Sequence, residues 1–155
     1  MSVPDETLAA AAADGDADAF SALLGRHYDR LFRIAFRLTG SRAEAEDLTQ
    51  DVAMALPAKL GGYRCEARFT TWLYRVLVNA AHDRRRRQGA QARAADGWGE
   101  VEIARRAEAA ESQAAMDWLS TAMAHLPEPL RDTLVLLFDD LTQAQVAEVL
   151  GISEG

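Results

Sequence analysis

The chain has 155 residues, 49% of them hydrophobic, and a formal net charge of −7. This length suits one domain or two small helical ones, and the apolar fraction is high enough to exclude a wholly disordered chain. Alanine is abundant, and glycine and proline are sparse within the apolar segments, which predicts an all-α fold. No apolar run approaches the roughly 20 residues of a membrane-spanning helix. The acidic N-terminus lacks the basic start of a secretory signal, so we expect a cytoplasmic protein without membrane insertion.

Cysteine and histidine usage excludes several kinds of chemistry. Cys65 is the sole cysteine, so an internal disulfide cannot form and a thiolate metal site within one chain is not expected. The histidines His27, His82 and His125 have no ligand spacing and are predicted to be packing or surface residues. No nucleophile–base pair or phosphate loop is evident, so we expect neither an enzyme nor a bound cofactor or metal.

The first part of the chain predicts three helices. Asp16 can cap the first, which carries apolar residues at a helical period up to about Leu38. A Ser-x-x-Glu capping box at Ser41 begins the second. Proline lacks an amide hydrogen and crowds the preceding turn, so we expect this helix to end or kink just before Pro57. The third is predicted from about 69 to 87, which would complete a first domain over residues 1–87.

The rest of the chain predicts a linker and a second helical unit. Residues 88–111 lose apolar periodicity and are interpreted as the linker, in which Trp98 is either a docking contact or a local packing residue. Residues 112–155 are predicted to begin with a helix up to about residue 126. Pro129 suits the first turn of the next helix. Thr142 opens a capping box for a short helix that ends at Gly151.

The charge is unevenly distributed along the chain. The segment from Arg64 to Arg93 has a net charge of +6, and the segments on both sides of it are acidic. It contains the run Arg84-Arg85-Arg86-Arg87, which is predicted either to meet a polyanion or to solvate a helix end. Such a cationic segment can bind phosphate groups.

Two helix faces are candidate binding surfaces. At 100° per residue, Asp47, Gln50, Asp51 and Met54 share a face of the second helix, which predicts a docking surface for a partner helix or simply a solvated face. The outer face of the third helix suits single-stranded DNA, because bases stack on indole rings and arginine neutralises phosphate. The alternative is that its tryptophan packs against the first helix. The residues of this outer face are Trp72, Arg75, Asn79, Asp83 and Arg86.

The C-terminal string LTQAQVAEVLGISEG has the form of the first half of a helix-turn-helix motif, although an ordinary corner between two helices is the alternative. A second, DNA-reading helix would follow Ser153, and we expect it to lie beyond Gly155. The candidate residues of the motif are Thr142, Gln143, Val146, Ala147, Gly151 and Ser153.

Three strings, in this order, resemble the extracytoplasmic-function (ECF) sigma factors, which belong to the sigma-70 family of bacterial RNA polymerase initiation factors. They are DADAFSALLGRHYDRLFRIAFRLTGSRAEAEDLTQDV, FTTWLYRVLVNAAHDRRRR and LPEPLRDTLVLLFDDLTQAQVAEVLGISEG. The resemblance implies a region-two domain, a linker and a region-four domain that lacks its recognition helix here.

The resemblance also implies roles for particular residues. Asp47, Gln50, Asp51 and Met54 would bind the clamp coiled coil of the large subunit of core RNA polymerase. The third helix and the loop before it would read and melt the minus-ten promoter element. An anti-sigma factor would cover these surfaces in the inactive state. The residues implied to contact the minus-ten DNA are Arg64, Arg68, Thr71, Trp72, Arg75, Asn79, Arg84, Arg85, Arg86 and Arg87.

Two other functions compete with the sigma-factor interpretation. A conventional helix-turn-helix regulator would bind duplex promoter DNA without polymerase. A protein-binding regulatory module would use the arginine run and the acidic segments for assembly, without melting DNA.

Overall fold

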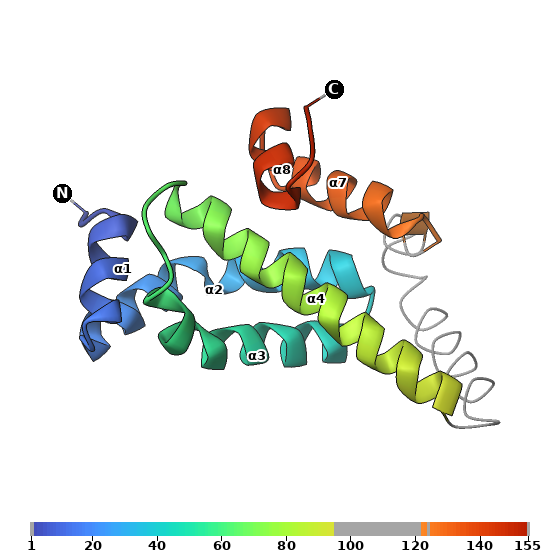
Figure 1. Cartoon of the computed structure of the whole chain (residues 1–155), viewed down its shortest axis with the longest axis horizontal. Helices are drawn as coiled ribbons and strands as arrows, with labels where there is room; N and C mark the ends of the chain where they lie inside the picture. Colours follow the sequence, from blue (N-terminus) through green and yellow to red (C-terminus); the bar gives the residue numbers. More distant parts are fainter. Residues whose placement is uncertain (1, 95–121, 124, 155) are drawn as a thin grey trace.

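The computed structural model describes residues 2–94, 122–123 and 125–154. Every regular element within these residues is an α-helix, which confirms the predicted all-α fold (Figure 1). The two N-terminal helices are α1 (Asp5–Ala13) and α2 (Ala17–Thr39). The sequence analysis did not identify α1, whose alanine-rich segment has little contrast between apolar and polar positions.

Local capping chemistry sets both ends of α2. The Asp16 carboxylate accepts hydrogen bonds from the amides of Asp18 and Ala19, each at 3.0 Å, and so satisfies two groups that have no partner within the helix. At the other end, Gly40 adopts a left-handed conformation with φ of 70°, which a residue without Cβ reaches at little cost. The predicted helix from Asp16 to about Leu38 is therefore confirmed.

The next helix, α3 (Arg42–Leu60), begins as predicted, because the Ser41 side chain accepts a hydrogen bond from the Glu44 amide. The helix does not end before Pro57, one of the two predicted outcomes, since it continues through this residue to Leu60. Pro57 lies within the last turn, so its missing donor removes a single helical hydrogen bond. Leu56 and Leu60 lie on the buried side of this turn and hold it against the core.

The longest helix is α4 (Phe69–Ala94), which extends past the predicted end at Arg87. Its buried stripe ends at Ala81, so the helical apolar period stops there. The arginines and glutamines that follow have high helix propensity and continue the helix beyond the apolar stripe. The first residues of the predicted linker are therefore helical, while the rest of the linker, including Trp98, lies outside the described residues.

The C-terminal unit contains α7 (Glu128–Phe138) and α8 (Gln143–Leu150). Pro129 lies in the first turn of α7, as predicted. Thr142 and Gln145 form the predicted capping box of α8. This helix ends at Gly151, where φ is 67°. The helix expected before α7 falls mostly outside the described residues.

The helices are arranged around α2 and α4. In Figure 1, α3 lies on one side of α2, and α7 and α8 lie on the other, while α1 packs at the N-terminal end. In the second unit, α7 contacts α2 and α8 contacts α4. The core is fully closed, since Leu31, Ile34 and Leu77 have no exposed surface. None of the helices in the described part of the chain is long and apolar enough to cross a bilayer.

We expect Leu77→Ala to lower the free energy of unfolding by about 2–5 kcal/mol, because it leaves a cavity in a close-packed core. The same change at Leu130, which is 56% exposed on α7, should alter this free energy by no more than about 0.5 kcal/mol. Urea unfolding followed by circular dichroism measures both. Equal losses from the two variants would contradict the placement of Leu77.

Candidate nucleic-acid interface

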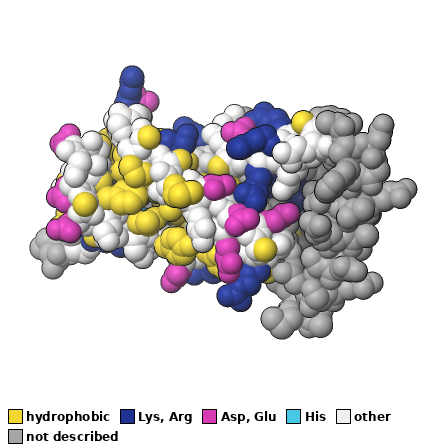
Figure 2. All heavy atoms as spheres, turned by 90° about the horizontal axis from the view of Figure 1, so that it is seen from below, with side chains coloured by type: hydrophobic (Ala, Val, Ile, Leu, Met, Phe, Trp, Pro, Cys, Tyr) yellow, Lys and Arg dark blue, Asp and Glu magenta, His cyan; other side chains and the backbone are white. Residues whose placement is uncertain are grey.

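The acidic stripe predicted on α3 lies at the surface. Asp47, Gln50, Asp51 and Met54 are all exposed, and Met54, at 74%, is the most exposed large apolar side chain among the described residues. The face on the side of α3 is seen in Figure 2, where apolar side chains gather next to interspersed acidic and basic ones. A mixed apolar and charged surface of this kind suits a protein partner better than nucleic acid.

Arg84 of α4 connects this stripe to the cationic helix. Its guanidinium group is 3.2 Å from the carboxylate of Asp47 and 3.2 Å from that of Asp51. An open groove of about 270 Å³ runs beside this contact, between α3 and α4, and Arg87 and Gln91 line it. The predicted docking surface and the predicted DNA-binding helix therefore meet at one ion-pair network.

Only some residues of the predicted DNA-facing side of α4 are fully exposed. Asn79, Asp83 and Arg86 are exposed along this side. Trp72 is half-buried and packs against the core. Thr71, another predicted DNA contact, has only 4% of its surface exposed, so it offers little surface to a strand in this arrangement of the helices.

The side chain of Trp72 belongs to an aromatic cluster. Its ring centroid lies 5.3 Å from that of Tyr63 and 5.7 Å from that of Phe69. Such offset or tilted rings attract each other beyond the area they bury. The indole is thus held by its aromatic neighbours but keeps part of its surface exposed to solvent.

The loop between α3 and α4 is fixed at several points. The Tyr63 hydroxyl donates a hydrogen bond of 2.7 Å to the Ala67 carbonyl. Burial, together with nearby Cys65, raises the pKa of Tyr63 to about 12, so the hydroxyl stays a donor at neutral pH. Cys65 is exposed and has a left-handed backbone with φ of 57°. Arg64 and Arg68, two predicted DNA contacts, are exposed on this loop.

The arginine run does not form one patch. Successive residues point about 100° apart on a helix, so Arg84 turns to α3, while Arg85 donates a 2.7 Å hydrogen bond to the Leu38 carbonyl of α2. Arg86 pairs with Asp83 on its own helix, and Arg87 is exposed. Several of these predicted phosphate contacts are therefore already engaged within the chain.

The C-terminal unit covers part of α4. Arg75, another predicted DNA contact, donates a hydrogen bond of 2.5 Å to the Glu148 carbonyl at the end of α8. The helix-turn-helix segment itself has Val146 and Ala147 buried, whereas Thr142 and Gln143 are exposed. Ser153 is exposed beyond Gly151.

His82 has a role that the sequence did not indicate. Its Nε2 atom lies 2.5 Å from the Asp132 carboxylate and 3.2 Å from that of Glu128, both on α7. Potential metal-ligand atoms of these three residues lie within 4.8 Å of one another. Arg85 also approaches Glu128 to 3.0 Å and so compensates its charge. Burial raises the pKa of Glu128, but the neighbouring Arg85 and His82 together lower it by more. The pKa of this carboxyl group therefore lies below its usual value.

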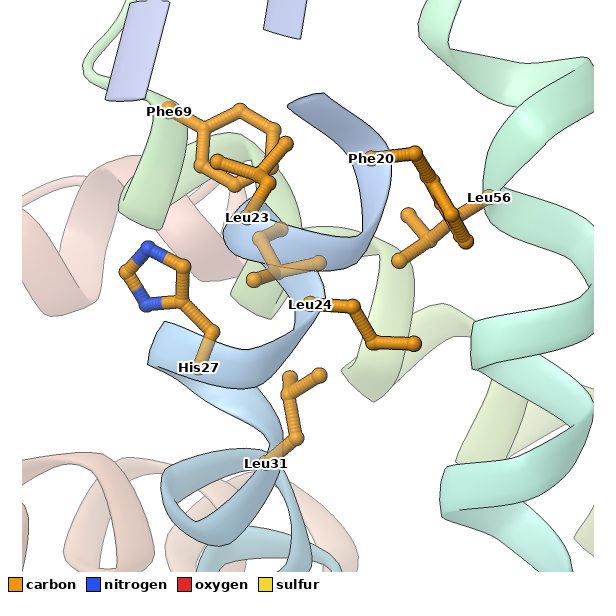
Figure 3. A pocket seen from close by; sticks show the side chains of 8 residues that line it. Phe20, Leu23, Leu24, His27, Leu31, Leu56 and Phe69 are labelled. Carbon is orange, nitrogen blue, oxygen red and sulfur yellow. The ribbon is translucent and has the colours of Figure 1, made fainter. Parts of the chain in front are cut away.

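An apolar pocket lies between α2, α3 and the start of α4. Figure 3 shows Phe20, Leu24 and Leu56 on one side of it, and His27 and Phe69 on the other. Its volume of about 10 Å³ is close to the room that one water molecule needs. This pocket is a packing gap and not a ligand site. His27 packs beside it, as predicted, and its ring contacts the Asp5 carboxylate at 2.7 Å.

Two family models match this arrangement. Sigma-70 region 2 matches residues 23–91, and the Sigma-70 region 4 model matches residues 116–155. The matched segments contain the α3 stripe, the α4 face and the helix-turn-helix segment. A bundle that presents these surfaces defines a transcription initiation factor of the sigma-70 type.

Individual relatives give a narrower assignment. ECF RNA polymerase sigma factor SigM of Mycobacterium tuberculosis is 34% identical over 97% of this chain and 76% of its own length. ECF RNA polymerase sigma factor SigW of Bacillus subtilis is 25% identical over 91% of this chain and 82% of its own length.

A solved structure agrees with these relatives. CnrH in complex with the cytosolic domain of CnrY matches with a TM-score of 0.69 and 27% identity, over 97% of this chain and 84% of that chain. The chain belongs to the ECF sigma factors of the sigma-70 family, which initiate transcription with RNA polymerase and are not enzymes. This assignment decides against the conventional regulator and the protein-binding module.

The aromatic cluster gives a test of the loop. In a chain whose only tryptophan is Trp72, made by Trp98→Phe and Trp118→Phe, we expect Tyr63→Ala to shift the fluorescence emission to longer wavelength, because the indole gains water contact. Tyr63→Phe keeps the ring and should leave the emission unchanged, while it lowers the free energy of unfolding by about 0.5–1.5 kcal/mol through the lost hydrogen bond. An unshifted spectrum for Tyr63→Ala would contradict the packing of Trp72 on Tyr63.

Proposed function

We propose that the α3 stripe of Asp47, Gln50, Asp51 and Met54 binds the clamp coiled coil of the polymerase large subunit. All four residues are exposed on one side of a rigid helix, and the thioether offers an adaptable apolar contact among the polar groups. Arg84 contacts the carboxylates of Asp47 and Asp51 from one side only. Their exposed oxygens can therefore accept hydrogen bonds from arginines of a partner.

The outer face of α4 and the loop before it are the proposed site for the separated non-template strand of the minus-ten element. The observation that carries this assignment is the partly exposed indole of Trp72, which packs against two aromatic neighbours. Arg75 and Asn79 follow it one and two helical turns later. Stacking of a base on an aromatic ring contributes about 1–3 kcal/mol, which offsets the cost of unpairing. The exposed Arg64 and Arg68 of the loop lie where backbone phosphates would follow.

The C-terminal unit is the proposed start of the reader of the minus-thirty-five element. The capped α8 and the left-handed Gly151 reproduce the first helix and turn of a helix-turn-helix motif. We assign residues 1–87 to region two, 88–111 to the linker and 112–155 to region four, although α4 itself continues into the assigned linker. Because this chain works with RNA polymerase on promoters, we propose that it acts in the cytoplasm.

An anti-sigma factor is the proposed regulatory partner. CnrH was solved with the cytosolic domain of CnrY, and RpoE of Bartonella quintana, 20% identical with a TM-score of 0.70, was solved with the anti-sigma factor NepR. The second of these supports the fold alone. The exposed Met54 stripe and the α4 face are surfaces that such a partner could cover in this chain.

Asn79→Ala tests the DNA role of α4. Because Asn79 is exposed, the change should leave the fold and the affinity for core polymerase intact. We expect open-complex formation to fall about two- to tenfold, the effect of one lost hydrogen bond. Permanganate footprinting with core polymerase measures opening, and a pull-down measures polymerase binding. Loss of polymerase binding instead would assign this face to docking.

Asp51→Arg tests the docking role of α3. Reversing this charge should weaken binding to core polymerase about tenfold or more, because a like charge then faces the basic partner. Asp29→Arg is the control, since Asp29 is also an exposed acid but lies on α2, outside the stripe. Equal affinity for both variants, measured by surface plasmon resonance, would count against the clamp assignment.

A further inference from the structure

The outward face of α2 carries three arginines that converge on one carboxylate. Arg30, Arg33 and Arg37 lie at helical spacing, and each reaches Asp139 at the end of α7. Arg30 donates to both the carboxylate and the main-chain carbonyl of Asp139, the latter at 2.7 Å. The guanidinium groups of Arg33 and Arg37 lie 3.8 Å from the same carboxylate oxygen. The side chain of Asp139 is only 5% exposed within this cage.

The charges in this cage do not balance. Three guanidinium groups surround a single carboxylate, and two of them are too far from it for a normal hydrogen bond. The Nη1 atom of Arg37 is buried without a hydrogen-bond partner. A DNA strand offers several phosphates in a row, so that each guanidinium group could have its own anion, and the planar guanidinium fork matches phosphate geometry. Arg33 and Arg37 therefore present guanidinium groups that Asp139 does not hydrogen-bond and that the phosphates of a strand could engage.

The cationic surface continues from α2 to α4. Arg85 of α4 donates to the α2 backbone at Leu38 and contacts Glu128 of α7. His82 contacts Glu128 and Asp132 beside it. The contacts to Glu128 and Asp132 each place an acid of α7 against a nitrogen-bearing side chain of α4. In Figure 1, α7 lies across α2 on the side opposite α3, so the proposed polymerase stripe stays uncovered.

We propose that Arg30, Arg33 and Arg37 form a phosphate-binding surface for promoter DNA, which Asp139 occupies while α7 lies on α2. This inference rests on the proposed DNA-binding function and adds a second helix to it. DNA phosphates and Asp139 then compete for the same guanidinium groups. Departure of α7 from α2 uncovers the arginines, and contact with DNA in turn favours the open arrangement.

The test compares Asp139→Asn with Arg33→Gln/Arg37→Gln, each alone and in combination. The full chain is titrated with a fluorescent oligonucleotide of mixed sequence, single-stranded and as a duplex, at several salt concentrations. Asp139→Asn should bind the probe several-fold more tightly than the unchanged chain and show a larger radius of gyration in X-ray scattering. Adding the two arginine changes to Asp139→Asn should reverse the gain and reduce the salt slope of log K by about 0.7–0.9 for each lost phosphate contact.

A different outcome would overturn the inference. If the arginines only hold α7 in place, removing them opens the chain as Asp139→Asn does, and DNA binding rises in both cases, which overturns the inference. Arg42→Gln is the matched control, because Arg42 is an exposed arginine outside this surface, and it should leave the salt slope unchanged. If Asp139→Asn gains no affinity for either probe, the inference is also overturned. The promoter role proposed for α4 is judged separately by Asn79→Ala in transcription, so the two failures are distinguishable.

Discussion

The burial of one side of α4 against α2 and α3 is the constraint on which the rest of this structure depends. Leu73 and Leu77 are sealed in the core, and this fixes the rotation of the whole helix about its axis. The direction of the polar residues that follow is then set as well: Asn79 points to solvent, Arg84 to α3 and Arg85 to α2. Apolar packing therefore determines the geometry of the charged surface, because a helix cannot turn one side without turning the others.

The same constraint places two kinds of recognition side by side. The acidic stripe of α3 and the cationic side of α4 belong to one rigid bundle, and Arg84 joins them through two carboxylates. Exposed ion pairs of this kind contribute little to stability. These ion pairs matter for a different reason. A partner that binds Asp51 also changes the electrostatic surroundings of Arg84, which belongs to the proposed nucleic-acid-binding helix. The surfaces proposed for polymerase docking and for strand binding are thus in electrostatic contact within one helical bundle.

Features with a local chemical cause could be predicted from the sequence. Asp16, Gly40 and Thr142 mark helix ends through caps and backbone conformation that depend on a few neighbouring residues, and the structure has them as expected. Long-range contacts could not be predicted this way. Asp139 meets Arg30 across 109 positions of the chain, and no spacing rule connects an acid and a base so far apart. Helix α1 and the polar end of α4 also escaped prediction, because both lack an apolar period.

The length of α4 has a geometric consequence. A helix of 26 residues is about 39 Å long at 1.5 Å per residue, and its buried stripe ends at Ala81. Its C-terminal half therefore works as a rigid arm whose direction is set by the bundle. Each residue added to or removed from that arm would turn whatever follows by about 100°. An insertion or deletion just after Ala81 would thus re-aim the arginines of α4 relative to the stripe on α3, while the buried stripe of the helix stays in place.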